Sequence, residues 1–234
     1  MDFEKEFAEL KALADRNCAV NEVLKTLHRY VNYYSQEHIE GVMAQFADEP
    51  DVSLEVADEG KVVGLENIRR YFSYMPIIAK KPGILMYHYV TTEVVAVAED
   101  GKTAKVTAMS PSCDAMAKAQ MQNWCYGKYY VDFIRNAQGE WKIWHIQWFS
   151  TFEAPVTVGW LKQQTAHKAE FTDPNLADAY EETLRVEREK SSYPEDWAYP
   201  THFDPKKKNY LMPEPAEPYA AWDGMTSMRK TREY

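Results

Sequence analysis

The chain has 234 residues, of which 45% are hydrophobic, and a formal net charge of −9. A chain of this length can bury a core that needs no disulfides, and no segment approaches the ~20 uninterrupted apolar residues of a membrane helix. The negative charge argues against nucleic acid as a partner, because phosphate binding depends on clustered Lys and Arg. Cys18, Cys113 and Cys125 lack metal-binding spacing and indicate buried thiols in a reducing compartment, so a cytoplasmic protein is expected.

The first part of the chain is predicted to be mainly helical. Apolar residues recur at spacings of three and four in a long first helix, in a short second helix, and in a third helix that opens at Gly64. Short strands over 52–56 and 61–63 separate the second helix from the third. The apolar stripe of the first helix is predicted to consist of Val20, Val23, Leu24, Leu27, Val31 and Tyr34.

From residue 84 the period of the apolar pattern changes to two, which predicts long strands. These strands are expected over 84–98, 103–110, 124–136 and 141–152, with a helical excursion between the second and the third. Helices followed by a meander of strands are typical of an α+β fold. We therefore expect helices to cover one face of a curved antiparallel sheet.

The composition changes after Pro155. Helices are predicted over 160–171 and 173–190, and beyond them prolines alternate with aromatic residues. Such a segment has no core of its own, so its aromatic side chains need a surface to cover. We divide the chain into a domain of residues 1–155 and a helical and extended arm of residues 156–234. The arm is expected to pack on this domain or on a neighbouring subunit, and its disorder is the alternative.

Several segments resemble one protein family. They are GKVVGLENIRRYF at 60–72, YHYVTTEVVAV at 87–97 and GKYYVDFIRNAQGEWKIWHI at 127–146, preceded by the run from Tyr30 to Phe46. Over about residues 20–153 the chain resembles the SnoaL-like branch of the nuclear-transport-factor-2-like superfamily. The resemblance implies a cystatin-like α+β cone whose open end admits a hydrophobic small molecule. It also implies that catalytic members work without a cofactor.

The same resemblance implies a site. In dehydratase members a Tyr on the first helix, an Asp five residues later and a His on the third strand meet inside the cone. The matching positions here are Tyr30, Ser35 and His88. Ser35 departs from the pattern, because it lacks the carboxylate that would hold the imidazole. Asp114, Asp132 or a carboxylate of the arm are candidates to replace it.

Strand alternation predicts which other side chains face the interior. Trp141 is expected to point inward, and His145 and Gln147 have the same parity. The resemblance implies catalytic roles for Tyr30 and His88. Histidine transfers protons near neutral pH, so His145 is added as the third predicted catalytic residue. For each of the three, a role in packing is the alternative. Neither a metal-ligand spacing nor a nucleotide-binding glycine motif occurs, so neither a metal nor a cofactor is expected. The predicted substrate-binding residues are Tyr34, Phe72, Thr92, Trp124, Tyr129 and Gln147.

The resemblance and the aromatic-rich composition, with seven Trp and sixteen Tyr, favour a cofactor-independent lyase acting on a hydrophobic aromatic or polycyclic compound. The resemblance implies dehydration, or deformylation or retro-aldol cleavage of a lignin-derived diaryl compound. An isomerase or cyclase of the same fold, and a non-catalytic small subunit of an aromatic-ring dioxygenase, are the alternatives. A homodimer or homotrimer is expected, and neither nucleic acid nor a membrane is expected as a partner.

Overall fold

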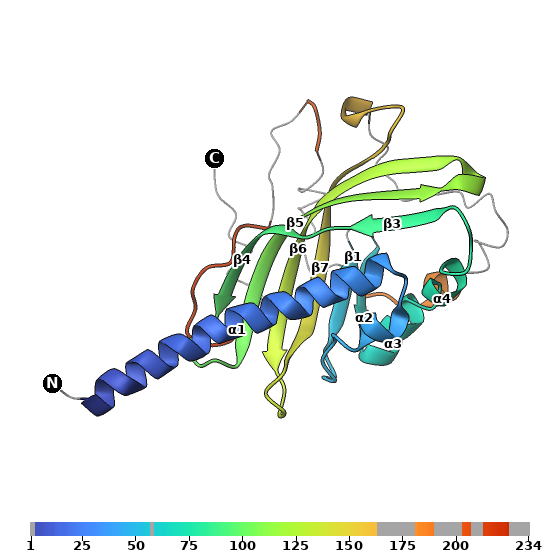
Figure 1. The fold of residues 1–234 in the computed structure, drawn as a ribbon. Coiled ribbons are helices and arrows are strands. Elements are labelled where there is room, and N and C mark those ends of the chain that lie inside the picture. The colour runs from blue at the N-terminus through green and yellow to red at the C-terminus, as the bar shows by residue number, and fades with distance from the viewer. Residues whose placement is uncertain (1–2, 57–58, 163–180, 190–202, 207–212, 225–234) are drawn as a thin grey trace.

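The computed structural model describes residues 3–56, 59–162, 181–189, 203–206 and 213–224. A long N-terminal helix is followed by short helices and strands and then by a large sheet (Figure 1). None of the described helices has the length and apolar character needed to cross a membrane. The elements are α1 (Phe3–Ser35), α2 (Ile39–Met43), β1 (Ser53–Val56), β2 (Gly60–Val63), α3 (Leu65–Tyr71), α4 (Met75–Ile78), β3 (Ile84–His88), β4 (Thr91–Val97), β5 (Thr103–Met116), η1 (Ala117–Ala119), β6 (Met121–Arg135), β7 (Trp141–Pro155) and η2 (Trp160–Lys162).

Seven strands form one curved sheet in the order β2-β1-β7-β6-β5-β3, and β4 also pairs with β5. α1 crosses one face of this sheet, and we call that face the inner face and the opposite one the outer face (Figure 1). The predicted α+β fold, with helices on one face of a curved sheet, is confirmed. The sheet is mixed rather than wholly antiparallel, because β1 pairs with β7 in parallel.

β5 and β6 form a long hairpin in place of the predicted helical excursion. β5 continues to Met116, and β6 begins at Met121 after the short turn η1. Fourteen residue pairs join the two strands from Thr103↔Ile134 to Met116↔Met121. Pairing along the whole hairpin therefore overrides the local helix propensity of the segment after Pro111. The strand predicted over 84–98 is also divided, into β3 and β4.

The main core lies between the helices and the inner face of the sheet. Leu27 of α1, Ile68 of α3 and Val131 of β6 are completely buried in it. The spacing of apolar residues in the sequence explains why these segments pack together. Residues three or four apart share one side of a helix, alternate residues share one face of a strand, and both sets reach the same interior. The buried aromatic side chains of this core are Tyr30, Phe46, Phe72, Tyr74, Tyr129, Phe133, Trp141 and Trp148.

A second, smaller core lies on the outer face. It joins Tyr130 and Phe149 of the sheet to Ala216 and Tyr219, which belong to residues 213–224, here called the strap. The Tyr219 hydroxyl lies 2.9 Å from Thr103 Oγ1. This part of the C-terminal arm thus packs on the sheet of its own chain.

The two helices predicted after Pro155 fall largely outside the described residues. Of the helix predicted over 160–171, the structure describes only the turn η2. Of the one predicted over 173–190, it describes 181–189, in which 181–185 are helical. Glu189 there forms an isolated bridge with Lys61 of β2.

Candidate functional site

His88 lies on the inner face at the end of β3. Ile84 and Met86 pack against the main core, and Leu85 and Tyr87 between them are exposed, so alternation turns His88 inward as well. Its Nδ1 lies 3.3 Å from the hydroxyl oxygen of Ser112, which is almost completely buried. That hydroxyl lies 3.2 Å from the hydroxyl of Ser110. The imidazole is therefore held by a serine chain on β5, whereas the family resemblance implies a carboxylate at the position of Ser35 on α1.

Ser35 has a structural role next to His88. Its Oγ accepts a hydrogen bond from the backbone N–H of His88 at 3.0 Å and donates one to the His88 carbonyl oxygen at 3.3 Å. A hydroxyl can do both because it is donor and acceptor at once. Ser35 thus fixes the end of α1 to the end of β3, and through the backbone it positions His88.

Aromatic side chains connect His88 to the main core. The ring of Tyr34 meets the His88 ring edge to face, with 4.6 Å between centroids, and its hydroxyl lies 3.3 Å from that of Tyr74. Phe72 packs against the other side of Tyr34, with centroids 6.1 Å apart. Tyr34 and Phe72, both predicted to bind substrate, are therefore brought together with His88.

Tyr30 lies one helical turn deeper than Tyr34. Its ring packs edge to face with Phe46 at 5.8 Å and with Tyr129 at 6.4 Å between centroids. Burial raises the pKa of Tyr30 well above its ordinary value, and the neighbouring phenols Tyr129 and Tyr34 raise it further. Burial likewise raises the pKa of Tyr129. Both phenols are therefore neutral at physiological pH and serve only as neutral hydrogen-bonding groups.

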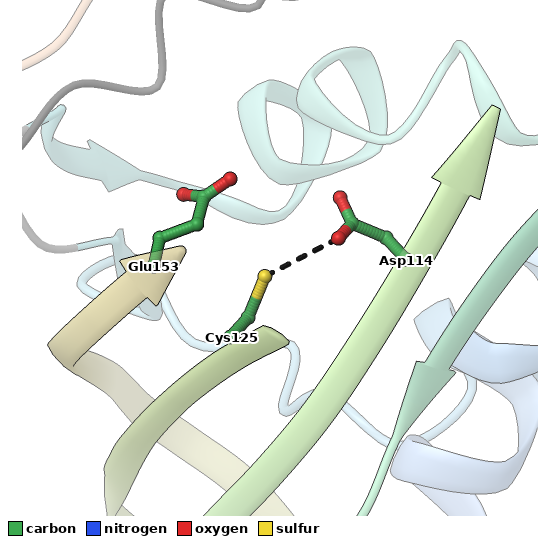
Figure 2. Close-up of side chains that lie close together, drawn as sticks. All are labelled: Asp114, Cys125 and Glu153. Carbon is green, nitrogen blue, oxygen red and sulfur yellow. Dashed lines mark hydrogen bonds between the residues drawn. The ribbon is translucent and has the colours of Figure 1, made fainter. Parts of the chain in front are cut away.

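The inner face carries a group of polar side chains next to the serine chain (Figure 2). The Cys125 thiol donates a hydrogen bond to Asp114 at 3.3 Å, and Glu153 completes the group. The Sγ and carboxylate oxygen atoms of the three side chains all lie within 4.8 Å of one another. Asn123 donates to Glu153 at 3.0 Å. We call Asp114, Cys125 and Glu153 the carboxylate–thiol cluster.

Cross-strand register joins this cluster to His88. His88 pairs with Ser112, Ser112 with Cys125, and Cys125 with Glu153, so the four residues form one row across β3, β5, β6 and β7. Asp114 follows Ser112 by two residues and therefore shares its face. Asp114 was a predicted replacement for the missing carboxylate, whereas Glu153 was missed.

Burial is the main cause that raises the pKa of Cys125, and the charges of Asp114 and Glu153 raise it further. The thiol is therefore protonated at neutral pH and acts as a hydrogen-bond donor, not as a nucleophile. Two carboxylates and a thiol are also three possible ligands for a borderline ion such as Zn²⁺, provided that the thiol ionises. Sequence spacing gave no sign of such a group, because its members lie on three different strands.

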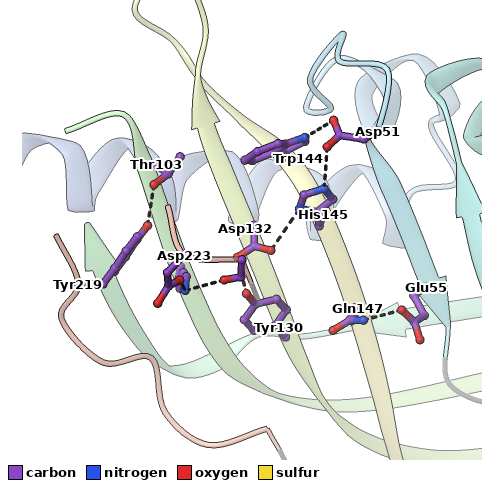
Figure 3. A network of polar contacts seen from close by, with 12 residues as sticks. Asp51, Glu55, Thr103, Tyr130, Asp132, Trp144, His145, Gln147, Tyr219 and Asp223 are labelled. Carbon is purple, nitrogen blue, oxygen red and sulfur yellow. Dashed lines mark hydrogen bonds and ion pairs between the residues drawn. The ribbon is translucent and has the colours of Figure 1, made fainter. Parts of the chain in front are cut away.

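His145 and Gln147 lie on the outer face, so the prediction that they point inward with Trp141 is wrong (Figure 3). The register of β6 and β7 shifts from Asp132↔His145 to Phe133↔Ile143, which leaves one extra residue in β7. Such a β-bulge exchanges the two faces for the residues that follow it. A second register shift, between Gly127↔Ser150 and Tyr126↔Phe152, exchanges them back before Glu153. Ile143 and Ile146 consequently both face the main core although three positions separate them.

On the outer face, His145 belongs to a second polar network (Figure 3). Its Nδ1 lies 3.2 Å from Asp132, which is completely buried and also accepts a hydrogen bond from Tyr130. Burial raises the pKa of Asp132, and the bonds from His145 and Tyr130 oppose this rise. Gln147 donates to the buried carboxylate of Glu55. The two histidines predicted to act together thus lie on opposite faces of the sheet.

Two other predicted substrate-binding residues lie away from His88. Trp124 is 40% exposed and points outward, since Cys125 and Tyr129 on the same strand point inward. Thr92 is exposed, with φ of 53°, at the irregular start of β4 where the pairing with β5 shifts. Of the predicted site, the structure therefore groups His88 with Tyr34, Phe72, Tyr30 and Tyr129, and it separates His145, Gln147, Trp124 and Thr92 from them.

Comparisons with known proteins agree with this fold. Residues 15–147 match the model of the SnoaL-like domain family. No curated protein is detectably similar in sequence. Solved structures of similar fold include a candidate scytalone dehydratase from Novosphingobium aromaticivorans, with a TM-score of 0.52 and 14% identity over 61% of this chain and 90% of that one.

Two further structures have the same fold. A hexachlorocyclohexane dehydrochlorinase from Novosphingobium barchaimii has a TM-score of 0.50 and 12% identity, covering 62% of this chain and 95% of that one. A nuclear-transport-factor-2-like superfamily protein from Salmonella enterica has a TM-score of 0.51 and 14% identity, covering 62% and 99%. At such identities the likeness concerns the fold alone. The family model, however, matches more than half of the sequence, and the chain therefore belongs to the SnoaL-like domain family.

Proposed function

We propose that this protein is a lyase that eliminates a leaving group from a hydrophobic small molecule by acid–base chemistry at the inner face, with His88 as the base. The observation that carries the proposal is the row formed by His88, Ser112, Cys125 and Glu153, in which a histidine and a carboxylate share one face with a chain of hydroxyls. Two proteins of similar fold, a candidate dehydratase and a dehydrochlorinase, are named for eliminations, which is consistent with this reaction class.

The serine chain fixes how His88 would act. For Nε2 to accept a proton, Nδ1 must carry the ring hydrogen and donate it to Ser112, whose own hydroxyl then donates to Ser110. His88 would remove a proton from a substrate carbon, the released electron pair would form the new double bond, and the leaving group would depart with its bonding electrons. The imidazolium would then return its proton to the leaving group or to water.

The surrounding side chains supply the remaining requirements. Tyr34 and Phe72 offer aromatic surface to a flat apolar substrate. The hydroxyls of Tyr34 and Tyr74 are donors that can stabilise negative charge as it develops on the substrate. Asp114 and Glu153 are placed to orient a polar substituent. The substrate class that we infer is therefore an aromatic or polycyclic compound with a hydroxyl or halide beside an acidic C–H bond, and dehydration is the favoured reaction.

The experiment compares two matched variants with the native chain. Purified protein is incubated with a panel of such compounds, and the elimination products are measured by mass spectrometry. His88→Gln is expected to lower turnover by at least about 100-fold, as loss of a general base does. His145→Gln, on the outer face, is expected to leave turnover within about threefold of native. Turnover that survives in His88→Gln at the native rate would exclude His88 as the base.

A further inference from the structure

The N-terminal half of α1, here called the projecting part, extends beyond the sheet (Figure 1). Every residue from 3 to 18 is exposed, whereas the second half of the helix buries Val23, Leu27 and Tyr30 in the main core. At 1.5 Å per residue the projecting part is about 24 Å long. Isolated helices of this length are marginal in water, so a partner is expected to stabilise it.

The projecting part carries an apolar stripe. Phe3, Phe7 and Leu10 are 74%, 70% and 65% exposed, and Ala14 continues their spacing of four, three and four residues. This is the spacing of a coiled-coil seam. At 100° per residue the stripe lies roughly 160° around the helix from the side that packs on the sheet. The chain's own sheet therefore cannot cover it by extending the existing contact.

We propose that this stripe, the residues Phe3, Phe7, Leu10 and Ala14, pairs with the same stripe of a second copy in antiparallel orientation. A two-fold axis then places Phe7 against Leu10 of the partner subunit, and Phe3 against Ala14 of the partner subunit. Such an isologous contact uses one surface twice and closes at two copies. The pairing converts the exposed stripe into a buried seam.

The charges beside the stripe are complementary between two copies of the chain. In the antiparallel register Glu4 lies beside Lys11 of the partner subunit, and symmetry repeats the contact. Lys11 also bonds Asp15 of its own helix at 2.6 Å, but both side chains are more than 60% exposed, so this bond is weak and can be shared. In a parallel pair, Glu6 would take the place of Glu4 beside Lys11 of the partner subunit. A parallel pair would also bring both sheets to the same end of the helices, whereas the antiparallel pair keeps them at opposite ends.

Another exposed apolar surface competes with the stripe as an interface. Leu85 and Tyr87 on β3 and Met109 on β5 are 46%, 43% and 46% exposed on the outer face. This sheet surface is separate from the stripe, because it lies on β3 and β5. It therefore serves as the control in the experiment.

The experiment measures the mass of the full chain by sedimentation equilibrium and light scattering at micromolar concentrations. The native protein is expected at twice its 27.2 kDa. The double variant Phe7→Glu/Leu10→Glu is expected at the monomer mass with an unchanged melting temperature of the sheet domain, and Tyr87→Lys is expected to remain a dimer. A native monomer or trimer, a dimer that survives Phe7→Glu/Leu10→Glu, or a monomeric Tyr87→Lys would each overturn the proposal.

Charge reversal distinguishes the two orientations. Glu4→Lys and Lys11→Glu are each expected to raise the dissociation constant about tenfold, because each creates two like-charge contacts. The double variant Glu4→Lys/Lys11→Glu is expected to restore native affinity. Restoration by Glu6→Lys/Lys11→Glu instead would show a parallel pair and overturn the antiparallel one.

Discussion

Ser35 shows how a single changed residue alters the support of a site. The family resemblance implies a carboxylate there that holds the imidazole, whereas the serine exchanges two hydrogen bonds with the backbone of His88. The imidazole itself contacts Ser112. The sequence identified the missing carboxylate, but it could not show what replaces it, because the replacement comes from a strand more than seventy residues away.

Ser35→Ala is expected to lower the free energy of unfolding by about 1–3 kcal/mol, because two partly buried hydrogen bonds are lost. Urea denaturation followed by fluorescence measures this change. Ser35→Thr keeps the hydroxyl and is the matched control, which should retain most of the stability. Equal stability of native protein and Ser35→Ala would show that the contact between α1 and β3 does not depend on this side chain.

The Cys125 thiol offers a second test at this scale. Because burial and two carboxylates raise its pKa, it should remain a thiol at pH 8.5, whereas Cys18 is exposed. Iodoacetamide reacts with thiolates. Peptide mass spectrometry is therefore expected to find Cys18 alkylated at pH 8.5 and Cys125 unmodified in the folded protein. Alkylation of both at similar rates would contradict the described environment of Cys125.

The strand β7 shows why parity alone mispredicted part of the site. Parity assigned His145 to the inner face, and the bulge moved it to the outer one. The sequence does contain a sign of the bulge, since Ile143 and Ile146 are three residues apart where strict alternation would require two or four.

The β5–β6 hairpin was mispredicted for a different reason. A helix-forming composition concealed the alternation of Ser110, Ser112 and Asp114, and without that register Glu153 could not be aligned with His88.

The strap is anchored to β5 by Lys105. This side chain is completely buried, pairs with Asp223 of the strap, and lies over the rings of Tyr219 and Trp222. Burial raises the pKa of Asp132, and the charge of Lys105 is one of the causes that oppose this rise. A buried cation between two acidic groups is therefore the main polar contact between strap and sheet within the described residues.

Lys105→Met preserves the shape of the side chain but removes its charge, which is one of the charges that act on the buried Asp132. It is expected to lower the free energy of unfolding by about 3 kcal/mol, as breaking a buried ion pair does. Limited proteolysis should also cleave near the strap earlier than in the native chain. Asp223→Asn, at a side chain that is 42% exposed, should have a smaller effect. A Lys105→Met variant as stable as native would refute this role.

At the scale of the whole molecule, the sequence predicted the architecture better than the site. The order of helices and alternating strands fixed an α+β fold, because these patterns are repeated along many residues. The parallel pairing of β1 with β7 left no local sign, since it joins segments about ninety residues apart. The site depends on which face each strand presents, and a single bulge reverses that for several residues at once. The fold therefore follows from averages over segments, whereas the site depends on individual register positions.

The claim that most needs testing is that the inner face around His88, and not the outer face around His145, binds the substrate. Histidine ring ¹H–¹³C resonances can be assigned with His88→Gln and His145→Gln and followed while the compound that is turned over in the panel is added. We expect saturable shifts of the His88 resonances and unchanged His145 resonances. Shifts of the His145 ring with an unperturbed His88 ring would contradict the account.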